Sequence, residues 1–298
     1  MYLILSTIAL RPYVFIFLAS FLFIAIINFG LRTTLLFSLL TYIVSLSSEW
    51  SSIHNGFPFG LYHYLGTTRG REIWMFGVPF MSSLSFTFLG FASYSVALLL
   101  CSPLYRKDSV IRMLDTWEIR RSARVWLMAA LFMVMIDFVV DPLSVLGEKW
   151  FLGRLFWYDP SGPHFGVPIS NYLGWYFVAA VTIAIFLVLD AALNRGKGRP
   201  YGAVPSFPMR SLLGPGLYLG IVGFGITMLF RIGEPGIAWA SVFIYVPFLT
   251  LSLHILTRRD FHADLSAIER HLEDFPYERD LPGWPEVEPQ PARERRTA

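Results

Sequence analysis

Two aspartates, Asp137 and Asp141, stand four residues apart in an apolar segment, so they share one face of a helix. An ionised side chain inside a bilayer costs roughly 2.5 kcal/mol or more, which makes an intramembrane acid a functional residue by default. Repulsion between two close acids, together with their removal from water, favours keeping one of them neutral and able to donate a proton. For Asp141 a place at the interface explains the sequence equally well, because Pro142 is expected to end the helix there. Asp137 lies more than one turn deeper, and we expect it to be the general acid.

A third acid, Glu49, is predicted to close an earlier apolar segment and to be followed by a loop of aromatic residues, glycines and prolines. Interfacial belts of Trp and Tyr explain the aromatic residues without any function. They do not explain an acid accompanied by His54 and His63. Because no HxxxH or HxxE spacing accompanies these histidines, we expect no metal and no other cofactor.

Composition indicates that membrane helices position these acids. The chain has 298 residues, of which 55% are hydrophobic and only 15% charged, and its mean hydropathy is +0.53. Soluble domains carry nearer 25% charged residues. We therefore predict an all-α, polytopic membrane helical bundle. Its seven predicted transmembrane helices lie near residues 12–30, 33–49, 74–101, 122–142, 168–192, 211–231 and 236–257.

The basic residues predict how the bundle is oriented. Three connections hold twelve of the 24 Lys and Arg residues, namely 102–124, 193–210 and the start of the tail, whereas 50–73 and 143–167 hold two each and 232–235 holds none. Basic connections face the cytoplasm. We expect an integral protein of the cell (inner) membrane with its N-terminus outside and its C-terminus cytoplasmic, inserted without a cleaved signal. The net charge of +3 is small and gives no reason to expect nucleic acid as a partner.

Two domains are expected, a transmembrane helical domain over 1–257 and a cytoplasmic tail over 258–298. From Glu273 onward the tail is rich in Pro, Glu and Arg, so it is predicted to be disordered and dispensable for chemistry. Segment 106–121 is compatible either with a solvated loop or with an interfacial amphipathic helix.

A short motif occurs twice and suggests a parallel internal repeat. Phe-Gly-Val-Pro stands at 76–79 and again 89 positions later at 165–168, and Glu49 and Asp137, which are 88 residues apart, each lie near the end of the preceding predicted helix. Ser82 and Asn171 each follow three residues after the proline. The alternative is chance combined with a shared way of starting helices, since proline is common at the first helical position.

The same residues resemble the carotenoid biosynthesis family of membrane proteins, which includes the CruF-type carotenoid 1,2-hydratases and the archaeal bisanhydrobacterioruberin hydratase. The resemblance covers roughly residues 33–257. The motifs that carry it are Glu49 with Pro58-Phe59-Gly60-x-Tyr62, Gly77-Val78-Pro79, Asp137-x-x-x-Asp141-Pro142, and Gly166-Val167-Pro168-x-x-Asn171-x-x-Gly174-Trp175. It implies hydration of an acyclic carotenoid end group across the terminal 1,2 double bond, leaving a tertiary alcohol.

The residues suit this chemistry on their own. Protonating an alkene needs a strong acid, for which Asp137 and Asp141 are the candidates, and the tertiary cation that results is stabilised by aromatic faces. We expect Trp50, Trp157, Tyr158 and Trp175 to shield the cation. Asn171, Tyr62 or Glu49 would place the water.

Three other interpretations stay open. A non-catalytic carotenoid- or lipid-binding protein would hold the pigment without changing it. A transporter would need polar residues deep in several helices, and three of the predicted ones have almost none. Asp137-x-x-x-Asp141 is also similar to the Mg-diphosphate motif of membrane prenyltransferases, but the second motif that they require is absent. The expected partners are an acyclic carotenoid in the bilayer, membrane lipids and other enzymes of the carotenoid pathway.

Overall fold

The computed structural model describes residues 2–107, 110–193, 209–257, 263–279, 281 and 284–285. Within these residues seven helices are long and apolar enough to cross a membrane. They are α2 (Pro12–Phe29), α3 (Leu31–Asn55), α4 (Phe80–Cys101), α6 (Ala123–Val145), α7 (Ile169–Leu193), α8 (Leu213–Arg231) and α9 (Pro235–Thr257). The predicted all-α polytopic bundle is confirmed, and the chain is an integral membrane protein. Its orientation in the membrane stays a prediction.

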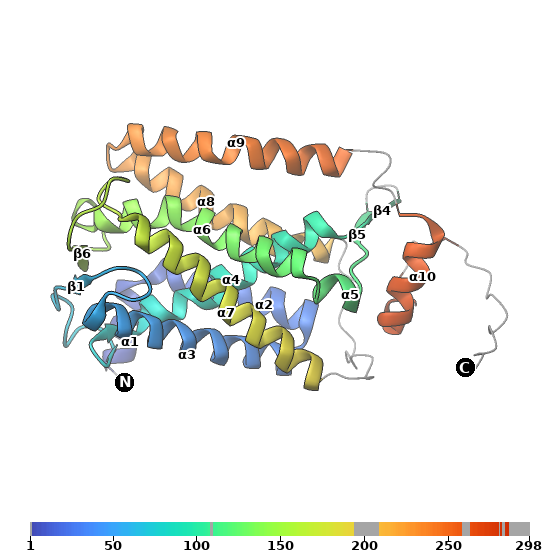
Figure 1. Ribbon diagram of the computed structural model, residues 1–298, viewed down its shortest axis with the longest axis horizontal. Coiled ribbons are helices and arrows are strands. Elements are labelled where there is room, and N and C mark those ends of the chain that lie inside the picture. The colour runs from blue at the N-terminus through green and yellow to red at the C-terminus, as the bar shows by residue number, and fades with distance from the viewer. Residues whose placement is uncertain are drawn as a thin grey trace.

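The helices run side by side along the long axis of the molecule, with α9 at one edge (Figure 1). Helix α4 is the most buried and packs against α2, α3, α6 and α8. Apolar lipid provides no hydrophobic force between helices, so close packing of small residues holds them together. Gly90, Ala92, Ser93 and Ala97 of α4 are all buried and permit this approach.

The two ends of the bundle differ in chemistry. Residues 56–79 and 146–168 form the end that we name the aromatic end, with β1 (Tyr62–Tyr64), β2 (Trp74–Met75), β3 (Val78–Pro79), η1 (Gly147–Lys149) and β6 (Phe156–Tyr158), beside α1 (Tyr2–Leu10). Residues 102–122, 209–212 and 263–279 form the basic end, with β4 (Leu104–Lys107), β5 (Val110–Met113), α5 (Trp117–Arg120), η2 (Arg210–Leu212), α10 (Leu265–Asp274) and η4 (Pro276–Glu278). Figure 1 shows β1 with β6 and β4 with β5 at opposite ends.

Three predicted helix boundaries were wrong. Helix α6 continues through Pro142 to Val145, because within a packed bundle neighbouring groups compensate the hydrogen bond that proline lacks. Helix α3 continues to Asn55, so Glu49 lies inside a helix and not at its end. Helix α4 begins only at Phe80, because residues 74–79 fold into the β2–β3 hairpin.

The repeated motif has the same backbone conformation at both copies. Phe76 and Phe165 have φ of 52° and 51°, and the glycines after them have φ of 85° and 92°. A phenylalanine in this left-handed region is uncommon. At both copies a long helix starts directly after the proline. The shared strained geometry supports an internal repeat over chance.

Two segments at the basic end are structured in ways that the sequence did not indicate. Strands β4 and β5 pair with each other and are followed by the single turn α5, where the sequence favoured a loop or an interfacial helix. Among the described residues after Glu273, Phe275 is fully buried and Pro276–Glu278 form η4, and the disorder expected further along the tail stays a prediction. The basic residues expected at 195, 197, 199, 258 and 259 lie outside the described part of the chain.

Candidate active site

One buried amide holds the two aspartates together. Asp137 and Asp141 lie on one face of α6, as their spacing predicts, and the first turn of α7 brings Asn171 opposite them. Nδ2 of Asn171 donates to Oδ2 of Asp137 and to Oδ2 of Asp141, at 2.7 Å in both cases. The hydroxyl of Tyr158 donates to the same Asp141 oxygen at 2.6 Å. We name Asp137, Asp141, Asn171 and Tyr158 the aspartate cluster.

The aspartate cluster is removed from water and holds no cation. Asp137 is 0% exposed and Asp141 is 7% exposed. Among the described residues, none forms an ion pair with either aspartate. Oδ1 of Asp137 is buried without a hydrogen-bond partner within the same residues. Buried polar atoms are almost always paired, so this oxygen needs an explanation.

Glu49 is the centre of a second cluster, built from hydroxyl groups. Ser45, one helical turn earlier in α3, donates to Oε1 at 3.2 Å, and Ser83 of α4 donates to the same oxygen at 3.0 Å. The hydroxyl of Tyr64 donates to Oε2 at 2.7 Å and lies 3.1 Å from Oγ of Ser82. We name these five residues the glutamate cluster. Its neutral donors can satisfy both oxygens of an ionised carboxylate.

Strands β1 and β6 join the two clusters. They pair antiparallel with Tyr62 opposite Tyr158 and Tyr64 opposite Phe156. Each strand belongs to the loop that follows one of the two acid-bearing helices, α3 or α6. Burial raises the pKa of Tyr64 and of Tyr158 well above the usual value of 10, so both hydroxyls keep their protons at neutral pH.

Both clusters reach one apolar cavity of about 150 Å³ near the aromatic end. Asp141 lines the cavity from the aspartate cluster, and Tyr64 and Ser82 line it from the glutamate cluster, whereas Asp137 and Glu49 lie behind them. Trp175 and Phe86 also line it, stacked with their ring centroids 4.4 Å apart. The remaining wall is mostly apolar and comes from α2, α4, α6, α8 and the loop at 150–156.

Two predicted site residues lie elsewhere. Trp50 is 47% exposed and packs on His54, because it follows Glu49 directly in a helix and so faces another side. Trp157 is 37% exposed and packs on His63, because neighbouring residues in a strand point to opposite faces. The other predicted residues all lie in the two clusters, between them or in the cavity wall. They are Glu49, Tyr62, Asp137, Asp141, Tyr158, Asn171 and Trp175.

Sequence reasoning missed Ser45, Ser82, Ser83 and Tyr64 as site residues. Two of them carried a usable signal. Ser45 and Glu49 have the four-residue spacing of neighbours on a helix. Ser82 occupies the position in the first repeat that Asn171 occupies in the second. Nothing in the sequence distinguishes Tyr64 from the other aromatic residues of its loop.

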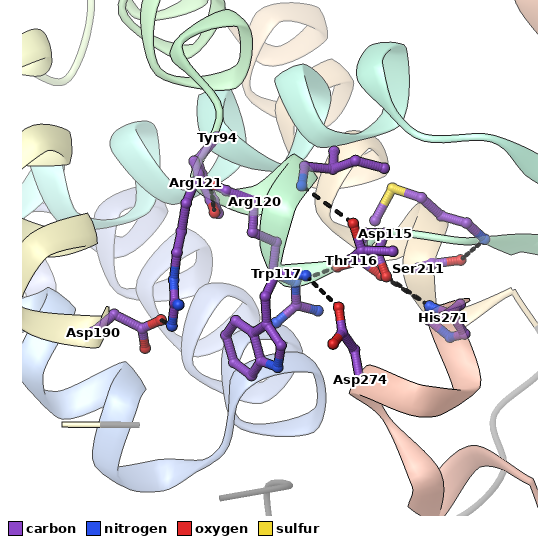
Figure 2. A network of polar contacts seen from close by, with 12 residues as sticks. Tyr94, Asp115, Thr116, Trp117, Arg120, Arg121, Asp190, Ser211, His271 and Asp274 are labelled. Carbon is purple, nitrogen blue, oxygen red and sulfur yellow. Dashed lines mark hydrogen bonds and ion pairs between the residues drawn. The ribbon is translucent and has the colours of Figure 1, made fainter. Parts of the chain in front are cut away.

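The basic end holds a polar network of a different kind (Figure 2). Asp115 pairs with Arg120, and Glu278 pairs with Arg210. Nδ1 of His271 lies 2.7 Å from the carbonyl oxygen of Asp115. Asp274 accepts a 2.7 Å hydrogen bond from the backbone N–H of Trp117, which ties α10 to α5. Two of its acids, Asp115 and Glu278, are paired with arginines, and Asp274 binds a backbone N–H, so this network serves the docking of α10.

One of the comparisons with known proteins identifies a family. A family model described as "Carotenoid biosynthesis protein" matches residues 1–233, a range that contains both clusters and the cavity and ends before α10. Comparison with curated proteins and comparison with solved structures each gave no match. Within the described residues, no three or more His, Cys, Asp or Glu side chains gather in a way that could hold a metal ion.

Proposed function

Because the chain belongs to the carotenoid biosynthesis protein family, we propose that it hydrates an acyclic carotenoid end group. Water adds across the terminal 1,2 double bond and leaves a tertiary alcohol. We chose this reaction because the motifs of the chain resemble those of carotenoid 1,2-hydratases. The observation that carries the proposal is one apolar cavity reached by an uncompensated pair of acids on one side and by a hydroxyl-bound carboxylate on the other.

The aspartate cluster is proposed to supply the proton. Asp141 faces the cavity, so it is the group that reaches the substrate, and Asp137 behind it shares the Asn171 amide. Two carboxyls this close cannot both ionise at low cost. A single proton held by the pair would also explain the buried Oδ1 of Asp137 that meets no donor. This assigns to Asp141 the direct transfer that the sequence suggested for Asp137.

The cavity wall and the glutamate cluster are proposed to control the cation and the water. Proton addition to the less substituted carbon leaves a tertiary cation, which the stacked faces of Trp175 and Phe86 can stabilise by about 2 kcal/mol in a desolvated site. Tyr64 and Ser82 line the cavity and can hold one water molecule. Glu49 accepts the hydrogen bond of Tyr64 and, through it, the proton that this water releases.

We place the hydrocarbon chain of the substrate between α2 and α8, where aromatic rings that pack together would have to separate to admit it. Tyr13 and Phe17 of α2 and Phe224 of α8 line the cavity and are partly exposed. The ring centroid of Phe224 lies 5.4 Å from that of Tyr13 and 5.7 Å from that of Phe17. A cavity of this size takes the branched end group, and the polyene would extend past these rings into the bilayer.

Expression in cells that accumulate lycopene tests the proposal. We expect the wild-type chain to produce a carotenoid heavier by one water, detected by mass spectrometry. Asp141→Asn and Asp137→Asn should lower the yield about 100-fold or more, because general acid catalysis contributes roughly 10²–10⁴-fold. Glu148→Gln, which changes an exposed acid at the same end, is the matched control and should leave the yield unchanged.

Two results would contradict the proposal. Pigment that co-purifies with the wild-type chain in unmodified form would instead support a carotenoid- or lipid-binding protein without catalysis. Full hydration by the inserted Asp137→Asn and Asp141→Asn variants would remove both aspartates from the chemistry.

A further inference from the structure

In the proposed reaction, each hydration moves one proton from the aspartate cluster to the glutamate cluster. A route that returns this proton is needed only if the proposed function is correct, so the inference rests on that function. The aspartate cluster gives one proton to the end-group carbon. The attacking water forms the C–O bond and loses one proton to the glutamate cluster. The product therefore leaves Asp141 without its proton and Glu49 with an extra one. The same imbalance arises if the two clusters exchange roles, so a second turnover needs a proton to cross between them.

Bulk water has little access to the three acids of the two clusters. Glu49 is 3% exposed, Asp141 is 7% exposed and Asp137 is 0% exposed. The hydrogen bonds of all three go to other buried or half-buried side chains. The wall of the cavity beside the clusters is mostly apolar, so a path through protein hydroxyls is an alternative to a chain of water molecules.

Tyr62 stands between the clusters and carries the hydroxyl that such a path needs. It is 5% exposed and lies directly opposite Tyr158 in the β1–β6 pair. The centroid of its ring lies 5.4 Å from that of Tyr64 and 5.7 Å from that of Tyr158. Tyr64 donates to Glu49 at 2.7 Å, and Tyr158 donates to Asp141 at 2.6 Å.

We propose that Tyr62 is a proton-relay residue, which returns the proton from the glutamate cluster to the aspartate cluster after each turnover. Glu49 gives its proton to the oxygen of Tyr64, which passes its own proton to Tyr62. Tyr62 passes its proton to Tyr158 in the same way, and Tyr158 gives one to Asp141. Each tyrosine ends with the proton count with which it began. No oxidant, reductant or additional reactant takes part.

The relay is required for repeated turnovers but not for the first one. This difference can be tested in the purified full-length protein in detergent or nanodiscs. Tyr62→Phe keeps the ring and removes the hydroxyl. With enzyme in excess over lycopene, we expect the variant to complete one turnover at a rate within about twofold of wild type. With lycopene in excess, its steady-state rate should fall at least about tenfold, because a proton-transfer group has been lost.

Tyr245→Phe is the matched control, since it removes a buried tyrosine hydroxyl that bonds to Tyr218 in the α8–α9 region. It should keep both rates. Two results would overturn the relay: a steady-state rate of Tyr62→Phe equal to that of wild type, or a loss of its single turnover as well, which would place Tyr62 in binding or folding. Absence of hydrated product from the wild-type protein would instead reject the proposed function.

Discussion

The buried acids of this protein fall into two groups, which differ in whether their partners are cations or neutral hydrogen-bond donors. At the basic end Asp115 and Glu278 are paired with arginines and approached by His271. At the aromatic end Asp137 and Asp141 meet only an amide and a phenol among the described residues. An ion pair holds a carboxylate permanently charged, whereas neutral donors allow it to gain and lose a proton. We therefore expect Asp115 and Glu278 to hold α10 in place, and we expect Asp137 and Asp141 to exchange protons in the proposed reaction.

The docking network should respond to pH through His271. Burial lowers the pKa of His271, but Glu278 and Asp115 outweigh it, and the pKa is raised from 6.5. The pKa of Glu278 is lowered from 4.5, because His271 and Arg210 outweigh its burial. A raised histidine pKa stabilises docking fully below pH 6.5, and this contribution is lost as the pH rises through the folded value. The contribution of Glu278 is present above pH 4.5 and is lost below it.

Docking of α10 should therefore be tightest between about pH 4.5 and 6.5 and should weaken as the pH rises above that window. Limited proteolysis of the tail, followed from pH 5.5 to 8.5, measures this directly. His271→Gln should remove most of the dependence over that range while leaving lycopene hydration intact. An unchanged cleavage rate in the wild type across the range would contradict the assignment.

At the scale of elements, close approach between a helix and a loop shapes the site. A Cβ on Gly174 of α7 would lie 2.5 Å from the carbonyl oxygen of Pro58 and 2.9 Å from Cα of Phe59. Both are backbone atoms that cannot rotate away. This contact holds the loop at 56–60 against α7, where Phe59 packs near Trp175 of the cavity wall.

Gly174→Ala should therefore displace this loop. We expect a loss of stability of about 1–3 kcal/mol, as for other overpacked positions, together with reduced hydration. Thermal unfolding in detergent and the lycopene assay measure the two effects. Gly220→Ala is the control, because a Cβ there meets nothing within 4 Å. Equal behaviour of the two variants would show that the contact does not constrain the site.

At the scale of the whole molecule, the aromatic end and the basic end lie at opposite ends of the long axis of the bundle (Figure 1). The cavity and both acid clusters lie near the aromatic end, where the proposed reaction would bring an apolar substrate from the bilayer together with water from one side. The ion-paired network lies at the other end. Basic loops face the cytoplasm, so the orientation predicted from the sequence places the site towards the outer surface.

Labelling of single cysteines tests this orientation. With Cys101 replaced by serine, Glu148→Cys at the aromatic end and Glu118→Cys at the basic end provide two exposed probes. An impermeant maleimide should label Glu148→Cys in intact cells and Glu118→Cys only after permeabilisation. The reverse pattern would invert the orientation and place the site at the cytoplasmic side.

Many residues of the candidate site could be predicted, because few charged side chains occur in sequences that span a membrane. An acid in an apolar segment is conspicuous, and helical spacing places Asp137 beside Asp141 whatever the neighbours are. The repeated Phe-Gly-Val-Pro motif likewise pointed to Ser82 as the counterpart of Asn171. Trp50 and Trp157 lie outside the two clusters and the cavity lining, and the direction of an aromatic side chain depends on local backbone geometry that composition does not reveal.

The sequence by itself determined the class of protein, the seven helices and the identity of the three acids, because apolar length and the cost of a buried charge are local properties. Only the tertiary structure decided that Asp141 faces the cavity while Asp137 and Glu49 stand behind it. It alone also decided that Tyr62 and Tyr158 pair across two loops, and that α10 is tied to α5 at the basic end. These outcomes depend on contacts between residues far apart in the chain, which no local pattern encodes.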